Sequence, residues 1–273
     1  MSQESIETVR RHYDADPAGE YARIDGRPEF LITMRFMRRY FRPGDRILDV
    51  GGGPGRYAIA LAKLGCDVTL VDLSPKNVRF AMEKAAESGV HISAAAGDAR
   101  FVDSIVQGEY DHVLLMGPLY HLQTEAEREQ AVRACLNRLR PGGTFWAAFI
   151  LMFAGVIYMM QHSPEAMLTE NVLVNECKQA VLDGKSFTGA GFTDIFYIDQ
   201  QEVAPFMAKF PLEKLHMFGQ ESILAPCEQH IMGSTPEAVE AWLDFSEKLA
   251  DREQFLSWSE HLMYVGRKIS ENL

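Results

Sequence analysis

The feature that most constrains the fold is a short apolar run that ends in three glycines at alternate positions. Residues 47–50 form the run, and Gly51, Gly53 and Gly55 follow it. Runs of this kind are typical of buried parallel strands. Because glycine has no Cβ atom, such a loop can turn tightly and let the backbone approach a bound molecule. We therefore expect a strand that carries the chain to a ligand at its carboxyl end.

The residues after the glycines complete a strand–helix–strand unit. Residues 57–64 have helical apolar spacing and Gly65 ends this helix, whereas residues 66–73 form a second strand with Asp72 near its end. In open parallel sheets, ligands bind beyond the carboxyl ends of the strands. The glycine loop and Asp72 are therefore expected to share one ligand site.

The glycine spacing separates two cofactor classes. A dinucleotide-binding loop has the pattern G-x-G-x-x-G. Counted from Gly51, its third glycine would fall at position 56, where this chain has an arginine. The spacing therefore disfavours an NAD-dependent oxidoreductase. What remains is an acid, Asp49, followed two residues later by the alternating glycines.

With Asp49 ahead of the glycines and Asp72 ending the next strand, the segment resembles motif I of the class I S-adenosylmethionine (SAM) methyltransferases. The resemblance implies SAM as cofactor and Asp72 as the acid that holds its ribose hydroxyls. It also implies that Asp98 accepts a hydrogen bond from the adenine amino group while the next residue packs on the ring; the alternative for Asp98 is a helix N-cap. The implied cofactor contacts of the core are Asp49, Gly51, Gly52, Gly53, Gly55, Asp72, Leu73, Asp98, Ala99 and Met116.

The N-terminal segment allows two interpretations. Residues 5–40 have helical spacing with a break at residues 16–19, and Tyr13 and Tyr21 lie beside this break. In small-molecule methyltransferases a similar segment folds over the cofactor, often through a tyrosine. The alternative is a pair of helices that shields one edge of the sheet. The spacing does not decide between them.

Residues 117–122, after a strand at residues 110–116, lie where the methyl donor and the acceptor are expected to meet. Methyltransferases that modify adenine N6 or glutamine have Asn/Asp-Pro-Pro-Tyr here, and this chain lacks the polar residue and the second proline. The stretch looks more like bacterial small-molecule methyltransferases related to the quinone-biosynthesis enzymes. His121 is the candidate general base and Tyr120 a candidate acceptor contact; a packing role for His121 is the alternative. His162, His216 and His230 are further candidates that nothing in the sequence selects.

Residues 151–200 are expected to form a helical cap over the acceptor. They read as an apolar helix, a break at residues 163–164, a second helix and a glycine-rich stretch at residues 188–191. Flexible thioethers suit a pocket that adapts to an apolar ligand. We predict that Met152, Met159 and Met160 contact the acceptor; ordinary core packing is the alternative.

The resemblance implies an α/β fold, with a Rossmann-like, doubly wound sheet of seven strands. Six strands are parallel, the last is antiparallel, and a helical cap is inserted. Residues 1–150 would form the SAM-binding core with N-terminal lid helices, residues 151–200 the cap, and residues 201–273 the C-terminal part of the core sheet.

Charge and composition exclude several classes of function. A formal net charge of −11 argues against binding nucleic acid, which needs clustered cations. The uncharged residues 145–160 are fewer than the roughly 20 that span a membrane, so no stable membrane insertion is expected. The four cysteines have no paired spacing, which indicates reduced thiols and a cytoplasmic location. The scattered histidines predict no metal site, and the oligomeric state stays open.

The function predicted from these residues is methyl transfer from SAM to oxygen, nitrogen or sulfur of a small, partly apolar acceptor. The alternative is a non-catalytic SAM-binding or scaffolding protein that keeps the methyltransferase fold. Turnover of SAM would distinguish the two.

Overall fold

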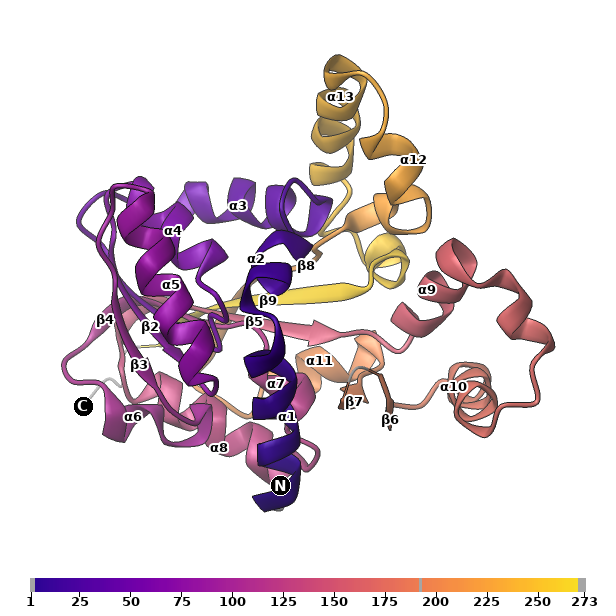
Figure 1. The fold of residues 1–273 in the computed structure, drawn as a ribbon, viewed down its shortest axis with the longest axis horizontal. Coiled ribbons are helices and arrows are strands. Elements are labelled where there is room, and N and C mark those ends of the chain that lie inside the picture. The colour runs from indigo at the N-terminus through magenta and orange to yellow at the C-terminus, as the bar shows by residue number, and fades with distance from the viewer. Residues whose placement is uncertain (1–2, 192, 270–273) are drawn as a thin grey trace.

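Seven strands form one mixed sheet in the order β3-β2-β1-β4-β5-β9-β8 (Figure 1). This computed structural model describes residues 3–191 and 193–269. The strands are β1 (Arg46–Val50), β2 (Asp67–Asp72), β3 (Ser93–Ala96), β4 (Tyr110–Leu115), β5 (Leu139–Ile150), β8 (Leu212–Gly219) and β9 (His261–Lys268).

The strand directions confirm the predicted sheet. β1 to β5 are parallel, and β9 is antiparallel to both β5 and β8, so β8 runs in the direction of the first five. Ile150 at the end of β5 pairs with His261 at the start of β9. The antiparallel strand therefore begins at the same edge of the sheet at which the parallel strands end.

Helices cover both faces of the sheet. On one face, apolar side chains of α3 (Pro28–Tyr40), α4 (Arg56–Lys63) and α5 (Pro75–Glu87) pack against β1 and β2. On the other face lie α6 (Val102–Ile105), α8 (Glu125–Leu136) and α11 (Gln200–Met207). Alternate residues of β5 contribute to the two cores, as the pleat requires: Trp146 faces the first set and Phe145 the second.

The predicted N-terminal break separates two helices, α1 (Gln3–Ala15) and α2 (Pro17–Arg23). Asp16 ends the first and caps the second, because its side chain accepts a hydrogen bond from the Gly19 amide at 2.9 Å. The Ser74 hydroxyl donates to Asp14 at 2.5 Å, which ties α1 to the start of α5. The N-terminal segment thus lies over the carboxyl edge of the sheet.

The cap contains α9 (Ala154–His162), a 3-10 segment (Pro164–Leu168) and α10 (Val172–Asp183), which extend away from the sheet (Figure 1). A hairpin of β6 (Phe187–Ala190) and β7 (Asp194–Tyr197) follows, where the sequence indicates only a glycine-rich stretch. Phe187 stacks on Tyr197 with ring centroids 4.9 Å apart. A ring of this kind can cover a glycine and replace its missing packing, which explains a strand through Gly189.

Between β8 and β9 the chain forms a small helical insertion with α12 (Glu228–Met232), α13 (Pro236–Glu247) and the 3-10 segments Ser222–Cys227 and Glu253–Trp258. Arg35 of α3 pairs with three carboxylates of α13, those of Glu240, Asp244 and Glu247, at 2.6–3.1 Å. Within the described ranges, no helix is both long and apolar enough to cross a membrane.

Candidate active site

The glycine loop after β1 has a backbone that only glycine adopts easily. Gly51 has φ +74°, and a Cβ atom built on it would lie 2.3 Å from Cδ of Pro118. Gly55 has φ +87°, and its Cβ would lie 2.8 Å from that of Ala81 on α5. The missing Cβ atoms of the two glycines therefore have different consequences. Gly51 allows the loop to pass close to the start of α7 (Pro118–His121), whereas Gly55 allows α4 to pack closely on α5.

Asp72 at the end of β2 holds the loop from the opposite side. Its carboxylate accepts hydrogen bonds from the amides of Gly53 and Ser74, both at 2.9 Å, and from the side-chain amide of Asn77 at 3.3 Å. Burial raises the pKa of Asp72, although these three donors oppose the change. One carboxylate therefore fixes the loop and lies at the floor of the cavity above it.

Asp49 is a buried carboxyl group without a partner in the described part of the chain. Its exposed fraction is 0%, and neither oxygen makes a hydrogen bond. Burial, with a further contribution from Asp72, raises the pKa of Asp49 to about 7. An isolated buried charge is costly, so the site favours a ligand that brings positive charge or hydrogen-bond donors to this carboxyl.

A cavity opens above the ends of β1, β2 and β4. It brings together most of the predicted cofactor residues, namely Tyr13, Asp49, Gly51, Gly52, Gly53, Asp72, Leu73, Asp98, Ala99 and Met116, together with Tyr120 and His121. Gly55 and Tyr21 are not among its lining residues. Gly55 is turned toward α5, and Tyr21 packs under the Arg56 guanidinium at 4.1 Å and beside Phe80 at 5.7 Å. Both predicted contacts are therefore replaced by packing contacts.

Asp98 has the N-cap role that was the alternative for it, and it also lies at the cavity. It accepts a hydrogen bond from the Arg100 amide at 2.9 Å, which is an N-cap, and it pairs with the Arg100 guanidinium at 2.5 Å. The contact with adenine stays a prediction.

A second cavity, of about 740 Å³, lies beneath the cap. Its cap side is apolar, with Ile150, Ala154, Tyr158, Met159, Leu173, Val174 and Tyr197, and its other side is charged, with Arg23, Arg27, Glu260 and His261. Met159 lines this cavity, and its contact with the acceptor stays a prediction; Met152 and Met160 are not among the lining residues. Met152 precedes α9 and is buried, with 2% of its surface exposed. Met160 is 61% exposed, because consecutive residues of a helix face different directions and Met160 points away from Met159.

The two cavities meet at five shared side chains. These are Tyr13, Glu20, Arg23, Tyr120 and His261. The first three come from the N-terminal helices, Tyr120 from α7 and His261 from the start of β9. A ligand above the glycine loop and a ligand beneath the cap would therefore face each other across this border.

His121 lies beside the border but is held at both ring nitrogens. Nε2 is 2.8 Å from the Tyr13 hydroxyl and Nδ1 is 3.1 Å from the Thr193 hydroxyl. Burial lowers the pKa of His121 to about 3, and His12 adds to this effect. The ring is therefore neutral and joins α1, α7 and the cap. Its role as general base stays a prediction.

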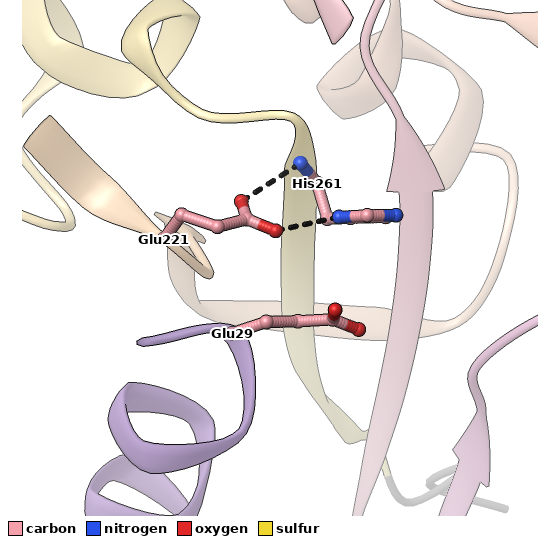
Figure 2. Close-up of side chains that lie close together, drawn as sticks. All are labelled: Glu29, Glu221 and His261. Carbon is pink, nitrogen blue, oxygen red and sulfur yellow. Dashed lines mark hydrogen bonds and ion pairs between the residues drawn. The ribbon is translucent and has the colours of Figure 1, made fainter. Parts of the chain in front are cut away.

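Glu221, His261 and Glu29 form a charged group that no sequence motif indicates (Figure 2). Nδ1 of His261 lies 2.6 Å from Oε1 of Glu221, while Oε2 of Glu221 accepts hydrogen bonds from Ser259 Oγ at 2.5 Å and from the amides of residues 260 and 261 at 3.1 and 3.0 Å. Burial alone would lower the pKa of His261, but the carboxylates of Glu221, Glu29 and Glu260 together outweigh it and raise the pKa to about 9.

Comparison with known proteins identifies the family. A family model described as a methyltransferase domain matches residues 47–143. The ubiquinone biosynthesis O-methyltransferase of Bordetella avium is 30% identical over 169 residues, which cover 57% of this chain and 69% of that protein. The chain belongs to the class I SAM-dependent methyltransferases.

A second sequence relative and one solved structure are also similar to this methyltransferase. The ubiquinone biosynthesis O-methyltransferase of Xanthomonas campestris pv. campestris is 34% identical over 131 residues, covering 45% of this chain and 54% of that protein, so the chain spans about half the length of this relative. The N-methyltransferase NodS of Bradyrhizobium japonicum, solved with S-adenosyl-L-homocysteine, has a TM-score of 0.58 and 13% identity over 96% of this chain and 98% of its own.

The residues present fit the cofactor of the family. The orphaned Asp49 carboxyl suits a cationic ligand, and SAM carries a sulfonium and an ammonium group. Gln220 lines the same cavity, and its buried Oε1 has no partner among the described residues, although its amide donates to Thr33 Oγ1 at 3.0 Å. A Cβ on Gly53 would meet only the Asn77 amide at 3.9 Å, so the loop is open on the cavity side.

Sequence reasoning missed several polar residues of the site. Arg23 on the border, and Glu29 and Gln220 in the first cavity, belong to no motif, and their neighbours in sequence give no sign that they meet. His261 is different, because a signal existed: it begins β9, the last strand, and the last strand was predicted to be antiparallel. Such a strand begins at the edge where the parallel strands end, which is the edge that binds ligands.

Proposed function

We propose that this protein transfers a methyl group from SAM to an oxygen atom of a small molecule with an apolar part. The observation that carries the proposal is the shared border of the two cavities, which would let a donor above the glycine loop face an acceptor beneath the cap. When bound, SAM supplies an electrophilic methyl group on a sulfonium sulfur. The protein's part is then to align the acceptor, exclude water and manage any proton the acceptor loses.

For the cofactor, we infer that the glycine loop and Asp72 bind the ribose side and that Asp98 and Ala99 hold the adenine. Asp49 and Gln220 would take the charged amino-acid end, because they offer the unpartnered buried oxygens. Met116 and Leu73 would pack on the same ligand.

For the acceptor, two arguments favour an uncharged, largely apolar molecule with a hydroxyl group. The cap side of the second cavity is formed by aliphatic, aromatic and thioether side chains. The curated relatives from Xanthomonas and Bordetella are named O-methyltransferases, which supports oxygen over nitrogen and sulfur.

All four cysteines are free thiols, which supports our inference of a cytoplasmic location.

The test is transfer of labelled methyl from SAM to a panel of acceptors matched in size and differing in the nucleophile: phenols, anilines and thiophenols. We expect turnover to S-adenosylhomocysteine with at least one phenol and slower transfer to its amine and thiol analogues. Binding of SAM without turnover of any acceptor would contradict the proposal and favour the scaffolding alternative.

Replacement of Asp72 tests the cofactor site. Asp72→Ala is expected to weaken SAM binding by about 1.5–3 kcal/mol, roughly 10- to 150-fold, which is the range for hydrogen bonds to a charged group. Asp67→Ala at the other, exposed end of β2 is the matched control. Calorimetry that gives equal affinities for the two variants would remove Asp72 from the site.

Replacement of the two neighbouring methionines of α9 tests the acceptor cavity. Met159→Ala removes a lining side chain, so we expect acceptor KM to rise by about tenfold, the order for lost apolar contacts in a pocket, with SAM affinity nearly intact. Met160→Ala removes an exposed side chain and serves as the control. If both variants change KM equally, the cavity beneath the cap is not the acceptor site.

A further inference from the structure

We propose that the Glu221–His261 pair is the general base of this enzyme: Nε2 of His261 takes the proton of the acceptor hydroxyl, and Glu221 positions the ring. The inference rests on the proposed function and deepens it, because it states that the acceptor is bound with a proton to lose. His261 would be a catalytic residue and Glu221 a positioning residue.

The fold places His261 at the point where transfer would occur. β9 is antiparallel to β5, so its first residue lies at the carboxyl edge of the parallel strands, beside Ile150. His261 lines both cavities, as few other side chains do. The hydroxyls of Tyr13 and Tyr120 lie on the same border, but burial raises the pKa of both well above the usual value. Both hydroxyls therefore stay protonated and do not compete with His261 as the base.

The orientation of the ring leaves one nitrogen for a substrate. Glu221 accepts from Nδ1 of His261 and is itself held by Ser259 and two backbone amides, so its carboxylate cannot turn away. Figure 2 shows the second ring nitrogen directed away from Glu221. Within the described residues, Nε2 makes no hydrogen bond. In His121, by contrast, both ring nitrogens already have partners.

The same group has ligand atoms close enough to hold a metal, and its chemistry argues for a base instead. One ligand atom from each of Glu29, Glu221 and His261 lies within 4.8 Å of the others. However, both oxygens of Glu221 are used in hydrogen bonds, and the Arg23 guanidinium lies 3.3 Å from Glu29, where it would repel a cation. We therefore assign no metal here.

Charges from all sides set the proton affinity of the ring. Carboxylates face His261 from Glu221 after β8, from Glu29 on α3 and from the adjoining Glu260. The cations Arg23 and Arg27 are paired with Glu29 and with Glu228 on α12, the latter at 2.5 Å. Burial raises the pKa of Glu260 to about 7, and Glu221 contributes. Below pH 9 the ring is mainly protonated, so the neutral base becomes more abundant as the pH rises toward this value.

The step balances without a further reactant. The acceptor O–H bond breaks and its proton moves to Nε2, while an oxygen lone pair forms the new bond to the methyl carbon. The electron pair of the broken carbon–sulfur bond stays on sulfur, which becomes neutral. The imidazolium then releases its proton to solvent.

The experiment compares His261→Gln, Glu221→Gln and His121→Ala with the unaltered enzyme. His230→Gln, at an exposed site on α12, is the matched control. For His261→Gln we expect kcat to fall by about 10²–10⁴, the usual worth of a positioned base, with SAM affinity by calorimetry changed less than about threefold. The rise of kcat with pH that reports this base should vanish in this variant and move to lower pH in Glu221→Gln. Added imidazole should partly restore His261→Ala.

A second readout does not depend on turnover or on the stability of a variant. In the unaltered protein, NMR of the histidine rings should show one resonance that titrates near pH 9 and shifts when a phenolic acceptor binds. No such resonance, or a rise of kcat with pH that survives in His261→Gln and disappears in His121→Ala, would overturn the assignment and leave methyl transfer itself intact. No methyl transfer by the unaltered enzyme would overturn both proposals.

Discussion

Gly51→Val is expected to raise the dissociation constant of SAM more than about 100-fold. At φ +74° a β-branched residue is strained, and its Cβ would lie 2.3 Å from Pro118 Cδ. Since Pro118 begins α7, the loop and α7 must separate, and both line the cavity to which we assign SAM. Calorimetry of SAM binding, together with a melting curve of the variant, measures the effect.

Gly44→Val separates backbone strain from this collision. Gly44 has φ +90°, and a Cβ there meets nothing within 4 Å. Both variants should lose stability through the strained backbone, by about 1–2 kcal/mol, but only Gly51→Val should lose SAM binding. A folded Gly51→Val protein that binds SAM as tightly as Gly44→Val would refute the role given to the loop.

Asp49→Asn is expected to stabilise the protein without SAM at alkaline pH and to weaken SAM binding. The folded-state pKa of Asp49, about 7, lies above its ordinary value of 3.8. The carboxyl therefore favours the folded state fully below pH 4, and this contribution is lost as the pH rises through 7. At about 1.4 kcal/mol per unit of pKa, the charged form costs up to about 4 kcal/mol above pH 8, and asparagine carries no such charge.

The two effects of Asp49→Asn have opposite signs, which makes the prediction specific. Denaturant unfolding at pH 8.5 should show a gain for the variant that shrinks toward pH 5, while calorimetry at pH 8.5 should show SAM affinity lower by about 10- to 100-fold, the worth of a hydrogen bond to a charged group. Asp67→Asn, at an exposed position of β2, controls for the change of net charge. A variant that is less stable at every pH would mean that Asp49 has a structural partner.

Local pattern and strand direction were enough to predict the sheet and to bring together most residues of the cavity above the glycine loop. The run before Gly51 and the acid at Asp72 place two strand ends and the loop between them, so their neighbours at the same edge follow from topology. Gly55 fitted the same pattern but serves helix packing, because alternate glycines along a loop need not face the same side. Tyr21 was misplaced because nothing in sequence tells which side of α2 meets α5.

The cavity-facing residues of the cap and the charged group of Glu29, Glu221 and His261 could not be predicted as well as the sheet. α9 is apolar around its whole circumference, so its sequence does not distinguish the cavity side at Met159 from the solvent side at Met160. Glu29, Glu221 and His261 come from three distant segments, and spacing along the chain carries no information about their contact. Only the direction of β9 links His261 to the edge that binds ligands.

The position of β9 has a consequence for the folding of this protein during its synthesis. β9 is the last strand along the described chain, yet it is an interior strand, paired with β5 on one side and β8 on the other. During synthesis, the long apolar edge of β5 therefore stays unpaired until residues 261–268 have left the ribosome. Open strand edges readily pair with other chains. The nascent protein thus passes through a stage prone to aggregation, and a chain shortened into β9 would leave β5 as an open edge and β8 without the strand that joins it to the sheet.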